Sequence, residues 1–113
     1  MSIDPVEVIT PHCAGRMHDR TDGELVSAAI AYNRGVTVTI PTAAPVPDHD
    51  EAVYDELTDT VVFRRDRALV TVYGLSPGHL TNIHGVAVAA AVDEQCETEY
   101  CAQIDPRNLE KTR

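Results

Sequence analysis

Short stretches of β-branched residues, in part alternating with polar ones, predict most of the strands in this chain. Residues 36–40 alternate strictly between apolar residues and threonine, and residues 6–9 form a shorter run of the same kind. Residues 60–64 and 68–73 are separated only by Arg65-Asp66-Arg67, which predicts a hairpin near the middle of a sheet. Residues 52–57 predict one further short strand.

A helix is predicted to follow the first strand, over Pro11 to Arg20. Thr10 supplies a hydroxyl suited to cap the helix, and proline is favoured at the first helical position. At helical spacing, Ala14 and Met17 are expected to face the protein interior.

A second helix is predicted to begin at once, because Thr21 and Glu24 have the spacing of a capping box. Its apolar residues recur at helical intervals: Leu25, Val26, Ala29 and Ile30. Gly35 is expected to end the helix in a left-handed conformation.

The remaining segments are less regular. Residues 41–50 contain three prolines and two aspartates, which predicts a loop. After residue 78 the spacing of Leu80, Ile83, Ala87 and Ala90 fits a helix, but residues 85–88 fit a strand equally well. The polar, acidic C-terminus is expected to form a tail or a docking segment. The pattern as a whole indicates an α+β protein.

Composition narrows this picture. Among 113 residues there is one Phe and no Trp, so the core must consist of small and β-branched side chains. The sequence shows neither a long apolar run nor a signal peptide, and with three cysteines it suggests a cytoplasmic protein.

The net charge is −9, from eighteen acidic residues against eight Arg and one Lys. An excess of carboxylates with so little lysine favours adaptation to a high-salt cytoplasm, as in halophilic organisms, over an acidic surface that binds a partner or mimics nucleic acid. Whatever its cause, the negative charge of the chain opposes nucleic-acid binding. Any nucleic-acid site must therefore be a local basic patch.

The most informative candidate chemistry is in the first predicted helix. His12, Arg16 and Arg20 are spaced by four and would share one face. An imidazole can move a proton near neutral pH, while guanidinium groups hold phosphate oxygens, so the trio suits a phosphodiester substrate. The alternative is an ordinary solvated helix face with Asp19 as counter-charge.

A resemblance adds to this evidence. The motif His-x-x-x-Arg-Met-x-x-Arg opens a helix within residues 9–35, and the hairpin of residues 60–73 ends in Val-Thr-Val-Tyr. This order resembles domain-of-unknown-function family 4258, which is itself similar to the RelE-like and BrnT-like toxins of toxin–antitoxin systems. The resemblance implies two N-terminal helices packed on a small, mostly antiparallel sheet. Residues 1–75 would form this core and residues 76–113 a C-terminal extension of the same domain.

Active relatives in these families cut RNA without metal, through attack by the ribose 2′-hydroxyl. The resemblance therefore implies that His12 is the acid–base group and that Arg16 and Arg20 anchor phosphate. Thr71 and Tyr73 would face the cleft, with Tyr73 in the catalytic set. The substrate would also contact a basic patch around the hairpin turn, formed by Arg64, Arg65 and Arg67.

The chain departs from this pattern in its acidity, in having Cys13 where a small apolar residue is usual, and in continuing about forty residues past Tyr73. The additional length suggests a docking element for an antitoxin, another protein or a second copy.

Two other sets of residues contain metal-binding or titratable side chains. One set consists of residue types that bind zinc: His12, Cys13, His18, Cys96 and Cys101. Their spacing does not match a recognised zinc site and favours unrelated thiols. No metal or other cofactor is therefore expected. His79 and His84 are expected at the surface.

The leading functional hypothesis is a RelE-like, toxin-type ribonuclease that binds RNA. The alternative is a non-catalytic binding or assembly protein of a virus or mobile element, which should be sensitive to truncation after Gly74.

Overall fold

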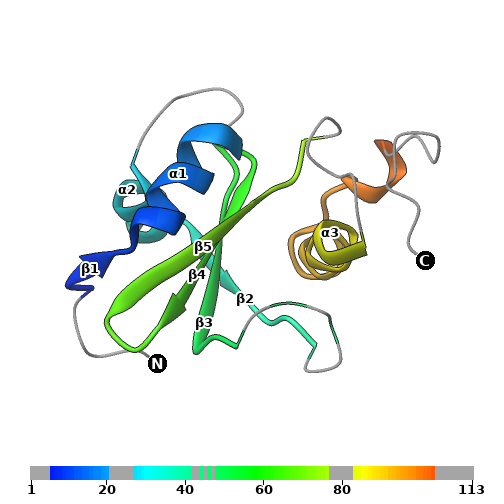
Figure 1. The fold of residues 1–113 in the computed structure, drawn as a ribbon. Coiled ribbons are helices and arrows are strands. Elements are labelled where there is room, and N and C mark those ends of the chain that lie inside the picture. The colour runs from blue at the N-terminus through cyan, green and yellow to red at the C-terminus, as the bar shows by residue number, and fades with distance from the viewer. Residues whose placement is uncertain are drawn as a thin grey trace.

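A computed structural model describes residues 6–20, 27–41, 44, 46, 48–76 and 83–103. They form three layers, in which a central sheet separates two N-terminal helices from a third helix (Figure 1). The fold is therefore α+β, as the sequence pattern predicts. No helix in the described part of the chain is long and apolar enough to cross a membrane.

The five-stranded sheet has the order β1-β5-β4-β3-β2. The β4–β5 hairpin lies second and third from one edge, close to the predicted central position. β1 is parallel to β5, and all other neighbouring strands are antiparallel. The strands are β1 (Val8–Ile9), β2 (Val36–Val38), β3 (Glu51–Asp55), β4 (Thr60–Arg65) and β5 (Ala68–Gly74).

The helices are α1 (Pro11–Arg20), α2 (Ala28–Arg34) and α3 (Ile83–Cys96), and a short 3-10 turn, η2, spans Cys101–Gln103. The helix predicted over 11–20 is confirmed. The segment left open between helix and strand is helical from Ile83 onward, and the strand alternative for residues 85–88 is wrong. Residues 36–40 and 52–57 contain shorter strands than expected, because the sheet pairing ends at Val38 and Asp55.

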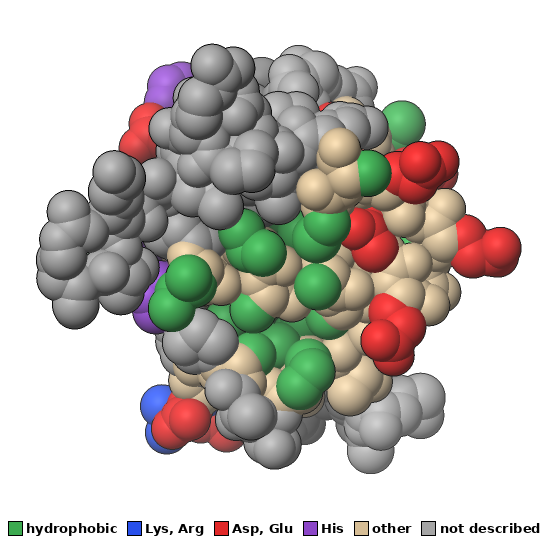
Figure 2. All heavy atoms as spheres, turned by 90° about the vertical axis from the view of Figure 1, so that its right-hand side faces the viewer, with side chains coloured by type: hydrophobic (Ala, Val, Ile, Leu, Met, Phe, Trp, Pro, Cys, Tyr) green, Lys and Arg blue, Asp and Glu red, His purple; other side chains and the backbone are tan. Residues whose placement is uncertain are grey.

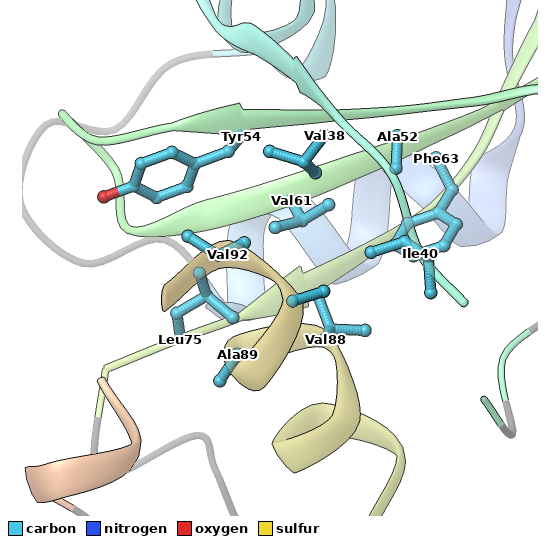
Figure 3. Close-up of a cluster of buried hydrophobic side chains, with 11 residues drawn as sticks. Val38, Ile40, Ala52, Tyr54, Val61, Phe63, Leu75, Val88, Ala89 and Val92 are labelled. Carbon is cyan, nitrogen blue, oxygen red and sulfur yellow. The ribbon is translucent and has the colours of Figure 1, made fainter. Parts of the chain in front are cut away.

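The hairpin strands β4 and β5 are the centre of the core because their side chains are buried on both faces of the sheet. Val62, Leu69 and Val72 pack against α1 and α2 on one face. On the other face Val61 and Phe63 pack against α3 (Figure 3), through a set of buried side chains that includes Leu75, Val88, Ala89 and Val92. Truncation after Gly74 would remove that third layer, so it would test folding rather than partner binding.

The structure confirms the inward position of Met17 in α1, but the other buried residues of α1 and α2 differ from the prediction. In α1 the buried residues are Cys13 and Met17, while Ala14 is exposed. In α2 they are Ala28 and Ala31, while Ile30 remains 49% exposed.

The described part of α2 begins at Ala28, where the Ser27 hydroxyl accepts a hydrogen bond from the backbone N–H of Ile30. The capping box at Thr21 and Glu24, with Leu25 and Val26, lies outside the described residues.

Gly35 ends α2 for a reason other than the one predicted. Its φ of −79° and ψ of 179° are extended rather than left-handed. A side chain is excluded here by proximity, because a Cβ would lie 2.5 Å from both the Tyr54 carbonyl oxygen and Val53 Cγ1. Glycine thus lets the chain pass from α2 into β2 in close contact with β3.

Gly35→Ala is expected to lower the free energy of unfolding by about 1–3 kcal/mol, because the new methyl group must displace backbone of β3. Gly15→Ala is the matched control: no atom lies within 4 Å of its Cβ position on α1, so the helix should gain roughly 0.5–1 kcal/mol. Urea denaturation of both variants measures the two changes. Equal effects of the same sign would contradict this account of Gly35.

A buried carboxylate ties α2 to the turn after β3. Asp55 accepts hydrogen bonds from Arg34 Nε and Nη2, both at 3.0 Å, and from the Thr58 hydroxyl at 2.7 Å. Burial alone would raise the pKa of Asp55, but the bonds from Arg34 and Thr58 outweigh burial and lower it. A carboxyl whose pKa is lowered by folding contributes stability above its unfolded pKa of about 4, and this contribution is lost as pH falls further.

Asp55→Asn is accordingly expected to destabilise the protein by about 2 kcal/mol at pH 7, because Arg34 then loses its partly buried ionic partner. The difference between variant and wild type should shrink below about pH 4, where the wild-type carboxyl becomes protonated. Chemical denaturation at a series of pH values measures this. A difference that is constant from pH 7 to pH 3 would show that the charge of Asp55 is not the stabilising feature.

Candidate functional site

The first helix is fastened to an exposed edge of the sheet. β1 pairs with β5 at Ala68 and Leu69, and within the described part of the chain no strand lies beside the backbone of β5 beyond them on that side. Instead the Thr10 hydroxyl, at the start of α1, donates to the carbonyl of Val70 at 3.4 Å. Arg20, at the end of α1, donates from Nη1 to the carbonyl of Val72 at 2.9 Å. Both ends of α1 are therefore held along the edge of β5.

This placement brings polar residues of α1 over two residues of β5. His12 Nε2 lies 3.5 Å from the Thr71 hydroxyl. One helical repeat or two farther on, Arg16 and Arg20 follow on the same face of α1, and the Arg20 guanidinium lies 5.5 Å from the centre of the Tyr73 ring. Five residues singled out from the sequence thus gather at one edge of the sheet.

The members of this edge cluster (His12, Arg16, Arg20, Thr71 and Tyr73) differ in exposure. His12 is exposed, the side chains of Arg16, Arg20 and Tyr73 are half-buried, and Thr71 is 7% exposed. A ligand approaching from solvent would meet the imidazole and the two guanidinium groups before it reached the strand.

The two guanidinium groups are close enough to repel each other. Burial lowers the pKa of Arg20, and the positive charge of Arg16 lowers it further. Burial raises the pKa of Tyr73, against the opposing effect of Arg20 and Arg16. Tyr73 is therefore a neutral hydroxyl at physiological pH, beside two cations whose repulsion a bound anion would relieve.

The three arginines of the hairpin are placed elsewhere. They lie toward the end of β5 that contains Ala68, whereas Tyr73 is near the other end. Arg64 is only 3% exposed and donates to the Asp66 carbonyl and the Tyr32 hydroxyl, while Arg67 forms an ion pair with Glu7 at 2.9 Å. Arg65 is exposed at the end of β4. The hairpin arginines therefore do not extend the edge cluster, and Arg64 holds α2 to the sheet.

The cysteines and remaining histidines lie apart from one another. Cys13 is buried between α1 and the sheet, where burial raises the pKa of its thiol to about 11. Cys96 and Cys101 pack on the opposite side of the sheet. Within the described ranges no three His, Cys, Asp or Glu side chains meet as metal ligands. His84 is exposed at the start of α3, and His79 falls outside the described residues.

One further imidazole, that of His49, lies on the face of the sheet that contains Tyr73, and no sequence motif predicted its place there. His49 stands edge-on to Phe63, with ring centres 4.6 Å apart, and Phe63 in turn lies 5.3 Å from Tyr73. His49 is in the irregular stretch before β3, where neither periodicity nor spacing connects it to β5.

Comparison with known proteins identifies the family to which the chain belongs. Residues 9–76 match the family Halo_toxin, described as "Putative RelE superfamily toxin domain". The match covers more than half of the chain, and the chain therefore belongs to this family. It supports the RelE-like resemblance but not the narrower assignment to family 4258. Neither the curated proteins nor the solved structures include a significant match.

Replacing Arg20 with Gln is expected to raise the pKa of Tyr73, because it removes the cation that most lowers that pKa. Arg16→Gln should shift it in the same direction by less. Alkaline titration of tyrosinate absorbance, with Tyr73→Phe subtracted to isolate this residue, measures both shifts. An unchanged Tyr73 titration in Arg20→Gln would place the guanidinium away from the ring.

Proposed function

We propose that this protein is a toxin-type ribonuclease that cleaves RNA at the edge cluster through attack by the ribose 2′-hydroxyl. The observation that carries the proposal is the fastening of α1 to β5 through Thr10 and Arg20. It sets an imidazole, two guanidinium groups and a neutral phenol around one exposed position. Membership of a RelE superfamily toxin family supports the same reading.

Each residue type has a distinct task in this proposal. Arg16 and Arg20 bind the non-bridging oxygens of the scissile phosphate and neutralise the charge that develops on them. The remaining N–H groups of Arg20 are aimed by the bond from Nη1 to Val72. Thr71 orients the imidazole of His12. Because Arg20 is held by the backbone of β5, its guanidinium needs little reorganisation when the charge forms.

The proposed reaction is a transesterification. His12 accepts the proton of the 2′-hydroxyl as the 2′-oxygen forms a bond to phosphorus. The bond from phosphorus to the 5′-oxygen breaks, and Tyr73 donates its proton to that oxygen. The products are a 2′,3′-cyclic phosphate and a 5′-hydroxyl, and the tyrosinate is stabilised by the two adjacent guanidinium groups until it is reprotonated.

The acidity of the chain restricts how RNA can be captured. With a net charge of −9, the long-range field repels a polyanion. Concentrated salt screens this repulsion within a few ångströms, but it also removes electrostatic steering. Close, bidentate contacts from Arg16 and Arg20 must then supply the affinity. The family also suggests an antitoxin as the silencing partner in the cell.

His12→Ala is expected to lower the RNA cleavage rate by about a hundredfold or more, since it removes the proposed base. His18→Ala is the matched control, an exposed histidine on another face of the same helix. The assay uses purified chain and a defined RNA in molar potassium chloride with chelator, and it identifies the cyclic phosphate product. Circular dichroism verifies that both variants fold.

Three results would count against the proposal. These are wild-type protein that is folded and free of bound partner but cuts no RNA, cleavage retained in His12→Ala, or equal losses in His12→Ala and His18→Ala. A substrate with deoxyribose at the scissile position is a further control, because it lacks the attacking hydroxyl and should resist cleavage.

A further inference from the structure

The opposite edge of the sheet, formed by β2, presents backbone groups that no strand of the described residues covers. Thr39 shows which groups of the edge face outward: its N–H donates to Oε1 of Gln95, and its carbonyl accepts from Nε2 of Gln95, both at 2.7 Å. The side-chain amide of Gln95 thus occupies the position of a neighbouring strand's peptide group. By the two-residue period of a strand, the N–H and carbonyl of Thr37 point to the same side.

Next to Thr37 the surface is hollowed rather than flat. A hollow of about 300 Å³ lies between the end of α2, the β2 edge and the C-terminal end of α3. Its apolar lining includes Val36 and Leu57, which are 55% and 58% exposed, together with the Cys96 side chain. Tyr54 adjoins it at the end of the core cluster, beyond Val38 and Val92 (Figure 3). Exposed aliphatic groups around such a hollow are typical of a binding surface.

The charge at this hollow is negative. Arg34 contributes to the lining, but its guanidinium is paired with Asp55. Glu56 is exposed, forms no ion pair with a described cation, and lies close enough to raise the pKa of Cys96 in addition to the effect of burial. Figure 2 shows carboxylates bordering apolar side chains on the side that α3 presents. Glu94 in α3 and Glu97 directly after it are exposed as well.

We propose that the β2 edge binds an extended segment of another protein, which adds to the sheet as a strand. Its backbone pairs with Thr37, one aliphatic side chain fills the hollow beside Val36 and Leu57, and an adjacent Lys or Arg pairs with Glu56. Backbone pairing supplies affinity in this mode of recognition, while the pocket and the charge supply specificity. A second copy of this chain is disfavoured as the occupant, because each copy is strongly acidic.

The position of this edge determines what such binding can do. In the strand order, β3 and β4 lie between β2 and β5, so the β2 edge and the edge cluster lie toward opposite edges of the sheet. A segment added to β2 therefore leaves His12 and Arg20 accessible. The β2 edge tethers the protein to a partner, and it does so without blocking the edge cluster.

The test uses the full chain and a fluorescent peptide of sequence Lys-Val-Thr-Leu-Thr-Val-Lys, at low salt where charge is least screened. Fluorescence polarisation is expected to show saturable binding, and NMR should place the shifts at Thr37 and Leu57. The same peptide with Glu in place of Lys should bind about tenfold more weakly. A version with N-methyl groups along one edge should not bind.

Two variants test the pairing and the hollow separately. Thr37→Pro removes the outward N–H, and Leu57→Asp makes the wall of the hollow polar and charged. Each is expected to weaken binding about tenfold or more. Thr37→Pro also changes the backbone of β2. Leu57→Asp changes an exposed side chain on a turn, so it tests the hollow without altering the strand. Glu56→Lys should reverse the preference between the Lys and Glu peptides. Ile30→Thr, an equally exposed aliphatic on α2, is the control and should bind as wild type.

Several outcomes would overturn the proposal. These are no saturable binding of the Lys peptide, binding that neither Thr37→Pro nor Leu57→Asp weakens, or shifts that map to α1 rather than β2. Protection of the Thr37 amide from hydrogen exchange in the free monomer would mean that the chain itself fills the edge. A concentration-dependent dimer abolished by Leu57→Asp would make a second copy the occupant. None of these outcomes depends on whether the protein cleaves RNA.

Discussion

The bond between Arg20 and the carbonyl of Val72 helps to determine where the residues of the edge cluster, the candidate functional site, lie. Among the described residues β1 pairs with two residues of β5, and a strand edge without a neighbouring strand has carbonyls that need other donors. Thr10 and Arg20 supply those donors from the two ends of one helix. The same contact that completes the sheet edge therefore sets α1 in register with β5, and that register brings His12 to Thr71 and Arg20 to Tyr73.

The helices on both faces of the sheet support this arrangement of α1 and β5. β5 can hold a helix at its edge because β4 and β5 are themselves buried on both faces, by α1 and α2 on one side and by α3 on the other. α3 lies beyond the residues that match the toxin family, yet its Val88, Ala89 and Val92 are fully buried in the core. The C-terminal part of the chain is thus a structural layer as well as the border of the hollow beside β2. In a protein with one Phe and no Trp, this extra layer supplies apolar contacts that larger side chains would otherwise provide.

The sequence predicted most elements because their patterns are local. Strict alternation over residues 36–40, the short turn between residues 64 and 68, and the Thr10-Pro11 helix start each depend only on near neighbours. The predictions were wrong where contacts between residues distant in the sequence determine the local structure. Gly35 is required by its proximity to Tyr54 and Val53, which no local turn preference encodes. Cys13 rather than Ala14 faces inward because the anchoring of Thr10 and Arg20 to β5 sets the rotation of α1.

The edge cluster could also be predicted in part from local patterns in the sequence. The spacing of His12, Arg16 and Arg20 follows from one helix, and the two-residue period of β5 puts Thr71 and Tyr73 on a common face. Their meeting depends on tertiary packing, which the family resemblance implied and spacing alone could not. The sequence does not distinguish the three hairpin arginines from one another. In the structure Arg64 is buried and donates a hydrogen bond to the Tyr32 hydroxyl. His49 reaches Phe63 from an irregular segment.

The most direct test of the central claim is an NMR map of RNA binding, with a short RNA whose scissile 2′-hydroxyl is replaced by hydrogen so that it binds without being cut. We predict the largest chemical-shift changes at His12, Arg20, Thr71 and Tyr73, with little change at Arg65 and Arg67. Shifts centred on the hairpin turn, or no saturable shifts along β5, would contradict the assignment of the substrate site to this edge of the sheet.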